Sequence, residues 1–262
     1  MEHPFTWYNL LPAGLQHSIG DHTFFAIVAA LLLLFFAIKA RSALAKAQDS
    51  VVPAAELGSR NIAELLVQLV AGLSDQIIGE PGRKYVPYFG TFFIFILLSN
   101  LLGLLPGFAP PTGNLNTTLG LALCSFVGYN IIGVREQGVP YFKHFVGPMT
   151  SLPGGTIISK LAFVPLLLIS VVFFLILELF SHIFRPVSLS LRLFGNIMGD
   201  HEVISAFISL TKFIIPVAFY LLGTLVAVIQ AFVFTLLSMI YVALAIGHGH
   251  DEEHGHDAHS SH

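Results

Sequence analysis

Charged residues are scarce in this chain: Asp, Glu, Lys and Arg make up 10% of its 262 residues, whereas hydrophobic residues make up 55%. A soluble domain of this length needs more charge to cover its surface, so the shortage indicates an integral membrane protein. The single cysteine, Cys124, excludes a disulfide framework within the chain. The N-terminus lacks the basic region and apolar core of a secretory signal, so we expect the first hydrophobic run to be kept as an anchor.

Catalytic and phosphate-binding motifs are also missing from the sequence. There is no His-Glu-x-x-His pair and no Gly-rich phosphate loop, and Asp200, His201 and Glu202 would point to three faces of a helix rather than to one metal. We therefore expect no catalytic site, no bound cofactor, no ATP site and no nucleic-acid partner in this chain.

Five hydrophobic stretches approach or exceed the ~20 residues that cross ~30 Å of hydrocarbon. They lie at 23–40, 86–106, 115–134, 161–211 and 216–246. The fourth is too long for one perpendicular span, which indicates a long tilted helix or a broken one, with Pro186 kinking it or opening a new segment.

A further segment, residues 59–80, interleaves apolar residues at helical spacing with Glu64, Gln68 and Asp75. This pattern predicts an amphipathic helix on the inner membrane surface, or a small helix packed on a partner. The turn at 107–114 closes a hairpin between the second and third spans, and we expect Asn116 or Thr117 to cap the helix that follows.

The predicted fold class is therefore an all-α integral membrane protein with about five membrane crossings. It has an N-terminal transmembrane helix, an amphipathic surface helix, a transmembrane hairpin and a long tilted C-terminal helical hairpin. Residues 1–247 form a single membrane domain, followed by a disordered, His-rich tail at 248–262. Basic residues such as Lys39, Arg41, Arg83 and Lys84 predict an outside N-terminus and a cytoplasmic C-terminus.

The fourth stretch carries a polar stripe centred on Arg192. On a helix, Glu178 falls within about 40° of the same face, and Asp200 and Glu202 lie about 80° to either side, with His201 roughly opposite. Four more polar residues fall near the face of Arg192: Ser181, Arg185, Ser188 and Asn196.

An arginine at membrane depth costs at least ~2.5 kcal/mol and does not lose its proton, so it needs a carboxylate, water or both. Two interpretations follow. Arg192 either forms a structural ion pair with Glu178 or Asp200, or it belongs to an ion pathway.

The last stretch carries a second polar seam, in which Gln230 and Tyr241 share a helix face within about 20°. Gln230 is placed to hydrogen-bond a guanidinium on a neighbouring helix, or to join two helices without a role in transport.

Two motifs carry a family resemblance. The runs PVSLSLRLFGNIMGDH (186–201) and IQAFVFTLLSMIYVALA (229–245) resemble subunit a of F-type ATP synthases, the stator part of the membrane ion channel. The anchor, the Arg60-Asn61 surface helix and the two hairpins follow in the family's order, so the resemblance covers most of residues 20–246.

The resemblance implies roles for individual residues. Arg192 would face the carboxylates of a rotating c-subunit ring, with Asn196 and Gln230 beside it. The family places a second titratable group of the outer path where this chain has Gly223, so Asp200 or Glu202 is expected to compensate. The remaining candidates are Glu178, Ser181 and the neighbouring His182 on the cytoplasmic path, Tyr241 on the last helix, and His201 on the outer path.

At the level of function, the resemblance implies translocation of ions, with protons expected, through two offset half-channels against the c-ring of an ATP synthase in a bacterial inner membrane. The implied partners are the c-ring, the b-subunit peripheral stalk, the remaining synthase subunits and the lipid bilayer. The alternative is a stand-alone cation or metal transporter with a His-rich tail, whose candidate ligands are His248, His250, His254 and His256.

Overall fold

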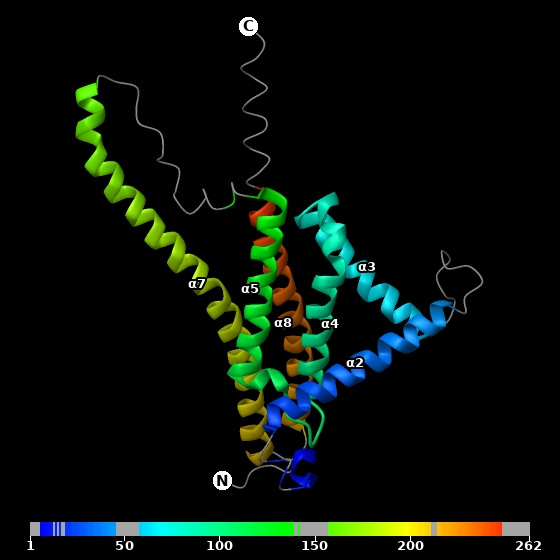
Figure 1. The fold of residues 1–262 in the computed structure, drawn as a ribbon. Coiled ribbons are helices and arrows are strands. Elements are labelled where there is room, and N and C mark those ends of the chain that lie inside the picture. Colours follow the sequence, from blue (N-terminus) through cyan, green and yellow to red (C-terminus); the bar gives the residue numbers. More distant parts are fainter. Residues whose placement is uncertain are drawn as a thin grey trace. The chain divides into compact units, whose positions relative to one another are not determined.

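The computed structural model describes residues 6–12, 14, 16, 19–45, 58–138, 141, 157–210 and 214–247. Over these residues the chain forms helices and no strands, which confirms the all-α fold class (Figure 1). The α-helices are α2 (Asp21–Ala45), α3 (Ser59–Ile77), α4 (Val86–Leu102), α5 (Leu115–Gln137), α7 (Ile157–Leu210) and α8 (Ile214–Gly247), and the 3-10 helices are η1 (Trp7–Leu10), η2 (Glu80–Tyr85) and η3 (Pro111–Gly113). The His-rich tail and its candidate metal ligands lie outside the described residues.

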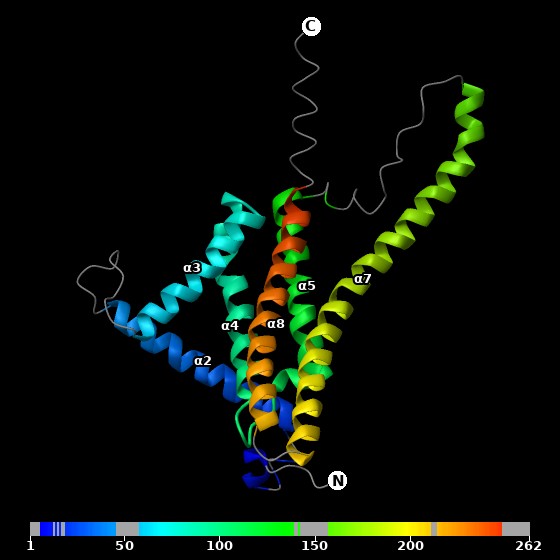
Figure 2. The same ribbon diagram turned by 180° about the vertical axis from the view of Figure 1, so that it is seen from behind.

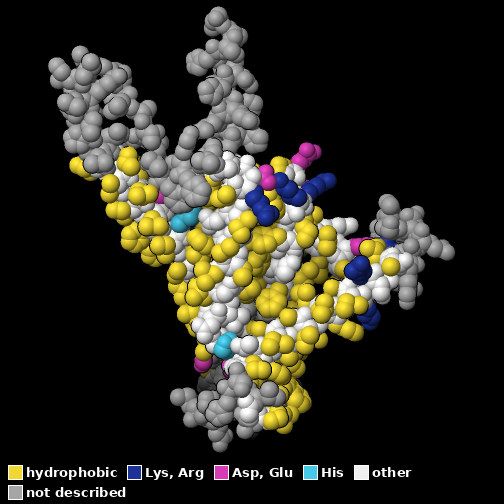
Figure 3. All heavy atoms as spheres, in the orientation of Figure 1, with side chains coloured by type: hydrophobic (Ala, Val, Ile, Leu, Met, Phe, Trp, Pro, Cys, Tyr) yellow, Lys and Arg dark blue, Asp and Glu magenta, His cyan; other side chains and the backbone are white. Residues whose placement is uncertain are grey.

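Five helical segments are long and apolar enough to cross a membrane: Asp21–Ala45, Glu80–Leu102, Leu115–Gln137, Ile169–Phe207 and Val217–Gly247. They overlap the five predicted stretches, so the chain is a multi-pass membrane protein. Large aliphatic and aromatic side chains stay exposed on them, as on α2, where hydrophobic side chains cover most of the visible surface (Figure 3). Lipid is the solvent that makes such exposure favourable.

The helix α7 is continuous over 54 residues and runs through Pro186. The predicted long helix is therefore confirmed, and the alternative of a break or a new helical segment at Pro186 is wrong. At 1.5 Å per residue the helix is ~80 Å long, more than twice the thickness of the hydrocarbon layer, so it must be strongly inclined to stay in the membrane. Proline removes one backbone donor, and membrane helices tolerate this where neighbouring groups satisfy the freed carbonyl.

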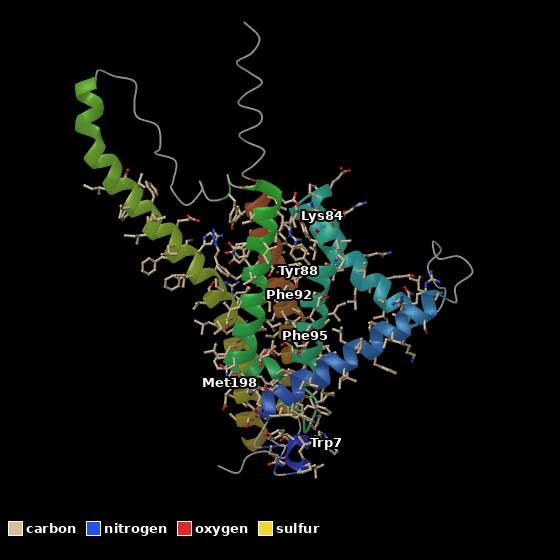
Figure 4. All side chains as sticks on the ribbon, viewed as in Figure 1. Trp7, Lys84, Tyr88, Phe92, Phe95 and Met198 are labelled. Carbon is tan, nitrogen blue, oxygen red and sulfur yellow. The ribbon has the colours of Figure 1, made fainter. Side chains whose placement is uncertain are left out.

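The chain divides into two compact units, and α5, α7 and α8 contribute residues to both. Unit 1 comprises residues 1–121 and 189–240, and unit 2 comprises residues 122–188 and 241–262. In unit 1, α2, α3 and α4 each contact the other two (Figures 1 and 2). Aromatic side chains fill this part: Tyr88, Phe92 and Phe95 follow one another along α4 (Figure 4), and the ring of Phe92 lies 5.6 Å from that of Phe234 on α8.

The predicted amphipathic helix is present as α3, and η2 follows it. Val70 and Ser74 are buried on one face, whereas Ile62 and Leu65 are exposed on another. Gly82 in η2 lies so close to α3 that an added Cβ would approach Ser74 Oγ to 2.5 Å. The 3-10 turn therefore packs tightly against the end of the amphipathic helix.

The hairpin turn between α4 and α5 is held by side-chain hydrogen bonds. Asn114 Oδ1 accepts a 2.9 Å bond from the backbone N–H of Asn116, so Asn114 caps α5 and the predicted cap at Asn116 or Thr117 is wrong. The helix begins at Leu115, so the capping position is the residue before it, Asn114. Several polar residues stand close together in this part of the sequence. On the other side of the turn, Thr112 Oγ1 donates to Asn100 Oδ1 at 2.7 Å, with both side chains buried.

Candidate functional site

The predicted site residues fall in both units, because α7 and α8 each pass from one unit to the other. Unit 1 contains Arg192, Asn196, Asp200, His201, Glu202 and Gln230. Unit 2 contains Glu178, Ser181, His182 and Tyr241. The structure therefore brings the candidates together in two groups, one in each unit.

In unit 1, the C-terminal part of α7 is anchored by Leu189, Leu193 and Ile197, which are buried at a spacing of four residues. Because successive helical residues point 100° apart, this spacing leaves the neighbouring positions Arg192 and Asn196 off the buried face. Both side chains are exposed. The anchoring stripe thus fixes which way the guanidinium faces: away from the packed side of the helix.

Asn196 is joined to α8 by a hydrogen bond, in which its Nδ2 donates to Gln230 Oε1 at 2.7 Å. Gln230 is only 2% exposed and lies among buried residues of its own helix, Ala227, Ala231 and Phe234. The structure thus confirms an interhelical hydrogen bond for Gln230, and its partner is the amide of Asn196. Gln230 Nε2 is buried and has no hydrogen-bond partner among the described residues.

Arg192 itself forms no ion pair with the described residues of unit 1. Asp200, one of the two partners expected for a structural ion pair, lies in the same unit and is not paired with it. Glu178, the other, contacts His182 at 3.3 Å in unit 2. An exposed guanidinium on a membrane helix therefore remains without a charge partner among the described residues of its own unit.

The three consecutive polar residues that follow differ in exposure. Glu202 is exposed, His201 is partly buried, and Asp200 has a buried oxygen, Oδ2, without a hydrogen-bond partner among the described residues. Gly223 is buried on α8, where an added Cβ would approach Leu104 Cδ2 to 3.1 Å and Ile204 Cδ1 to 3.6 Å. Two aliphatic side chains thus close the space at Gly223, and a titratable side chain does not fit there without repacking.

In unit 2, the candidates on α7 meet residues of α5 and α8. The Nδ1 atom of His182 lies 3.3 Å from Glu178 Oε1, and Ser181 between them is exposed. Tyr241 of α8 lies under the guanidinium of Arg185, 5.4 Å from ring centroid to Cζ. The polar stripe predicted on this part of α7 therefore has aromatic neighbours as well as its own charged groups.

Sequence reasoning missed the contribution of α5 to this group. The ring of Tyr129 lies 6.1 Å from that of His182 and 5.7 Å from that of Tyr241, and Tyr141 Oη donates to Asn130 Oδ1 at 2.8 Å. The adjacent Tyr129 and Asn130 inside an otherwise apolar span were the available signal, since polar residues at membrane depth are costly.

A metal centre is not found in the described part of the chain, where no three His, Cys, Asp or Glu side chains gather around one point. The four tail histidines expected as metal ligands lie outside the described residues. The described site thus combines amides, carboxylates, imidazoles and the two guanidinium groups of Arg192 and Arg185 on membrane helices.

Comparison with known proteins places this geometry in context. A sequence model described as ATP synthase A chain matches residues 23–243. The ATP synthase subunit a of Bdellovibrio bacteriovorus is 43% identical over 247 residues, which cover 94% of this chain and 99% of the relative. The ATP synthase subunits a 1 and a 2 of Syntrophotalea carbinolica are 39% and 40% identical, and each alignment covers 95% of this chain and 100% of the relative.

Proposed function

The chain belongs to the ATP synthase A chain family, and on that premise we propose that it is the non-catalytic channel subunit of an F-type ATP synthase. Its partners are a ring of c subunits, the b-subunit peripheral stalk and the remaining synthase subunits. It lies in a bacterial inner membrane with its N-terminus outside and its C-terminus in the cytoplasm. It passes protons between two half-channels and the ring, so that the transmembrane gradient drives ATP synthesis.

The observation that carries this proposal is the exposed Arg192 on a membrane helix, which has no ion pair with any described residue of its own unit. A guanidinium at membrane depth is costly unless a carboxylate or water compensates it, and it does not escape the cost by losing its proton. A carboxylate supplied from outside the chain meets this need, and a ring of c subunits presents such groups one after another.

The electrostatics of this pairing explain how the gradient is used. A ring carboxylate facing lipid must be neutral and therefore carries a proton, whereas opposite Arg192 the ionised form is favoured. Each ring position thus releases its proton on one side of Arg192 and takes up another on the other side. Each elementary charge that moves across 100 mV releases ~2.3 kcal/mol, which ring rotation captures.

The two groups of polar residues supply the access paths. Glu178, Ser181 and Tyr241 of unit 2 line the cytoplasmic path, with His182 beside Glu178. On the outer path, His201 is joined by Asp200. The buried Oδ2 of Asp200 has no hydrogen-bond partner among the described residues, which favours Asp200 over the exposed Glu202 as the second relay group. Asn196 and Gln230 hold α7 against α8 beside Arg192 and keep its helix face in place.

The test is ATP-driven proton pumping by the whole complex in inverted membrane vesicles. Arg192→Ala is expected to abolish pumping while the subunit still co-purifies with the c-ring. The matched control is Arg41→Ala, which removes another exposed arginine, at the end of α2, and is expected to pump at the wild-type rate. Sustained pumping by the Arg192→Ala complex would refute the proposal. A chain that purifies without a ring and carries Zn²⁺ by itself would support the stand-alone transporter instead.

A further inference from the structure

Glu178 and His182 lie next to each other on α7, and His182 is more buried than the two residues that follow it. The two side chains are one helical turn apart, and the Nδ1 atom of His182 lies 3.3 Å from Glu178 Oε1. His182 is 7% exposed, whereas its neighbours Ile183 and Phe184 are more than half exposed. The imidazole is therefore the side chain that this part of α7 turns inward.

Two aromatic rings of α5 enclose the imidazole. The ring of Phe126 stands nearly perpendicular to it at 6.2 Å, and the ring of Tyr129 lies at 6.1 Å with an interplanar angle of 58°. Tyr129 is itself 2% exposed and stays in place against Tyr241 at 5.7 Å. This packing restricts the rotamers open to His182 and keeps its imidazole beside the carboxylate of Glu178, where Nδ1 and Oε1 lie 3.3 Å apart without the geometry of a hydrogen bond.

The charged and titratable groups around the pair come from three sources. Glu178 and Arg185 lie on α7 itself, and Tyr241 lies on α8. The third source is α5 with the residue that follows it, which supply Tyr129 and Tyr141. Of these side-chain types, only histidine has an ordinary pKa that puts its charge change between about pH 5 and pH 8.

We propose that His182 is a positioning residue for Glu178, and that its protonation sets how readily the cytoplasmic path passes protons. The inference rests on the proposed function, in which Glu178 lines that path. A protonated imidazole holds the carboxylate by a charge-assisted contact. When Glu178 then takes up a proton from the cytoplasm, the imidazolium loses its counter-charge, so uptake is disfavoured. A neutral imidazole imposes no such cost, and the carboxylate exchanges protons freely.

The experiment measures ATP-driven pumping in inverted vesicles, whose cytoplasmic face is open to the medium. Pumping by His182→Asn and by wild type is compared from about pH 5.5 to about pH 8.5. Taking the ratio of the two rates cancels the pH dependence of all other groups. The rate of His182→Asn divided by the wild-type rate is expected to be about two- to fivefold higher at the acidic end than at the alkaline end. This factor corresponds to the free energy of one ion pair.

The matched control is His22→Asn, which removes a histidine that lies 3.4 Å from Asp21 at the start of α2. Its ratio to wild type is expected to stay constant with pH. If His182→Asn does not assemble with the ring, His182→Gln is measured against the same criterion. A constant ratio in an assembled complex overturns the inference, because a side chain that only fills space changes the rate equally at every pH.

A variant in the background of Glu178→Gln separates this inference from the proposed function. Glu178→Gln alone is expected to slow pumping at least about a hundredfold, the lower end of an acid–base contribution. Adding His182→Asn to it is expected to leave the pH profile unchanged, because the group through which His182 acts is gone. A change that persists in this background overturns the inference. Wild-type pumping by Glu178→Gln would instead remove Glu178 from the path, and the proposed role of unit 2 with it.

Discussion

Replacing the two partners of the hydrogen bond between Asn196 and Gln230 is expected to change the stability of the protein by different amounts. Asn196 is exposed and donates its Nδ2, whereas Gln230 is 2% exposed and accepts through Oε1 at 2.7 Å. Asn196→Ala leaves a buried oxygen without a donor, and the free energy of unfolding is expected to fall by about 1–3 kcal/mol. Gln230→Leu removes that oxygen together with a buried Nε2 that already lacks a partner among the described residues, so it is expected to cost less than about 1 kcal/mol.

The double variant distinguishes a hydrogen bond from two independent packing effects. Once Gln230 is leucine, Asn196→Ala is expected to change the unfolding free energy by less than about 0.5 kcal/mol. The coupling energy obtained this way is expected at about 0.6 kcal/mol or above and not beyond about 1.7 kcal/mol, the average and the maximum measured for side-chain hydrogen bonds between membrane helices.

The assay is unfolding of the purified full-length chain in mixed micelles by increasing fractions of sodium dodecyl sulfate, followed by circular dichroism. The matched control is Met198→Ala, an exposed position two residues further along α7 (Figure 4), which is expected to change stability by less than about 0.5 kcal/mol. An equal cost for Asn196→Ala in the wild-type and Gln230→Leu backgrounds would refute the reasoning, since it would mean that the two amides do not interact.

Three further predictions follow from contacts in unit 1, read out by the same unfolding assay. Asn114→Ala removes the cap of α5 and is expected to cost about 0.5–2 kcal/mol, whereas Asn116→Ala leaves the cap intact and is expected to cost less; the reverse order would contradict the assignment. Thr112→Val deprives a buried amide oxygen of its donor and is expected to cost about 1–3 kcal/mol, with Thr112→Ser retaining the bond and most of the stability. The hydrogen bond from Arg83 lowers the pKa of Asp75 from its ordinary 3.8. The contribution of this pair is therefore full above pH 3.8 and lost as the pH falls below that value, and a pH titration of Arg83→Gln is expected to lack this loss.

The spans were predictable because the bilayer imposes a length and a hydrophobicity that are visible in sequence windows. All five predicted stretches overlap helices that are long and apolar enough to cross a membrane. The helix α3 was recognisable from its mixed polar and apolar pattern. Pro186 was misjudged as a possible break because its effect depends on neighbours that satisfy the freed carbonyl, and sequence windows do not contain those neighbours. The cap at Asn114 was missed because several adjacent polar residues are equally good cap types, and only backbone geometry selects one of them.

The site was partly predictable for a different reason. Arg192, Glu178 and Gln230 stand out because polarity is costly inside a membrane, so each such residue is conspicuous in its sequence context. Their partners were not visible in the sequence, since Asn196 and Gln230 are 34 positions apart and meet only when α7 packs on α8. Tyr129 of α5 was missed altogether, because its relation to His182 arises entirely from helix packing.

The sequence by itself determined that this chain is helical, that it crosses a membrane several times, and that one of its long helices carries a permanent positive charge among apolar residues. These properties depend on local composition and on the cost of polar groups in lipid, which act on each segment separately. Only the tertiary structure decided that Arg192 has no ion pair with the described residues of its own unit, that Asn196 donates to Gln230, and that two rings of α5 lie against His182. Such contacts join residues distant in the chain, and they depend on which faces of the helices are buried against one another.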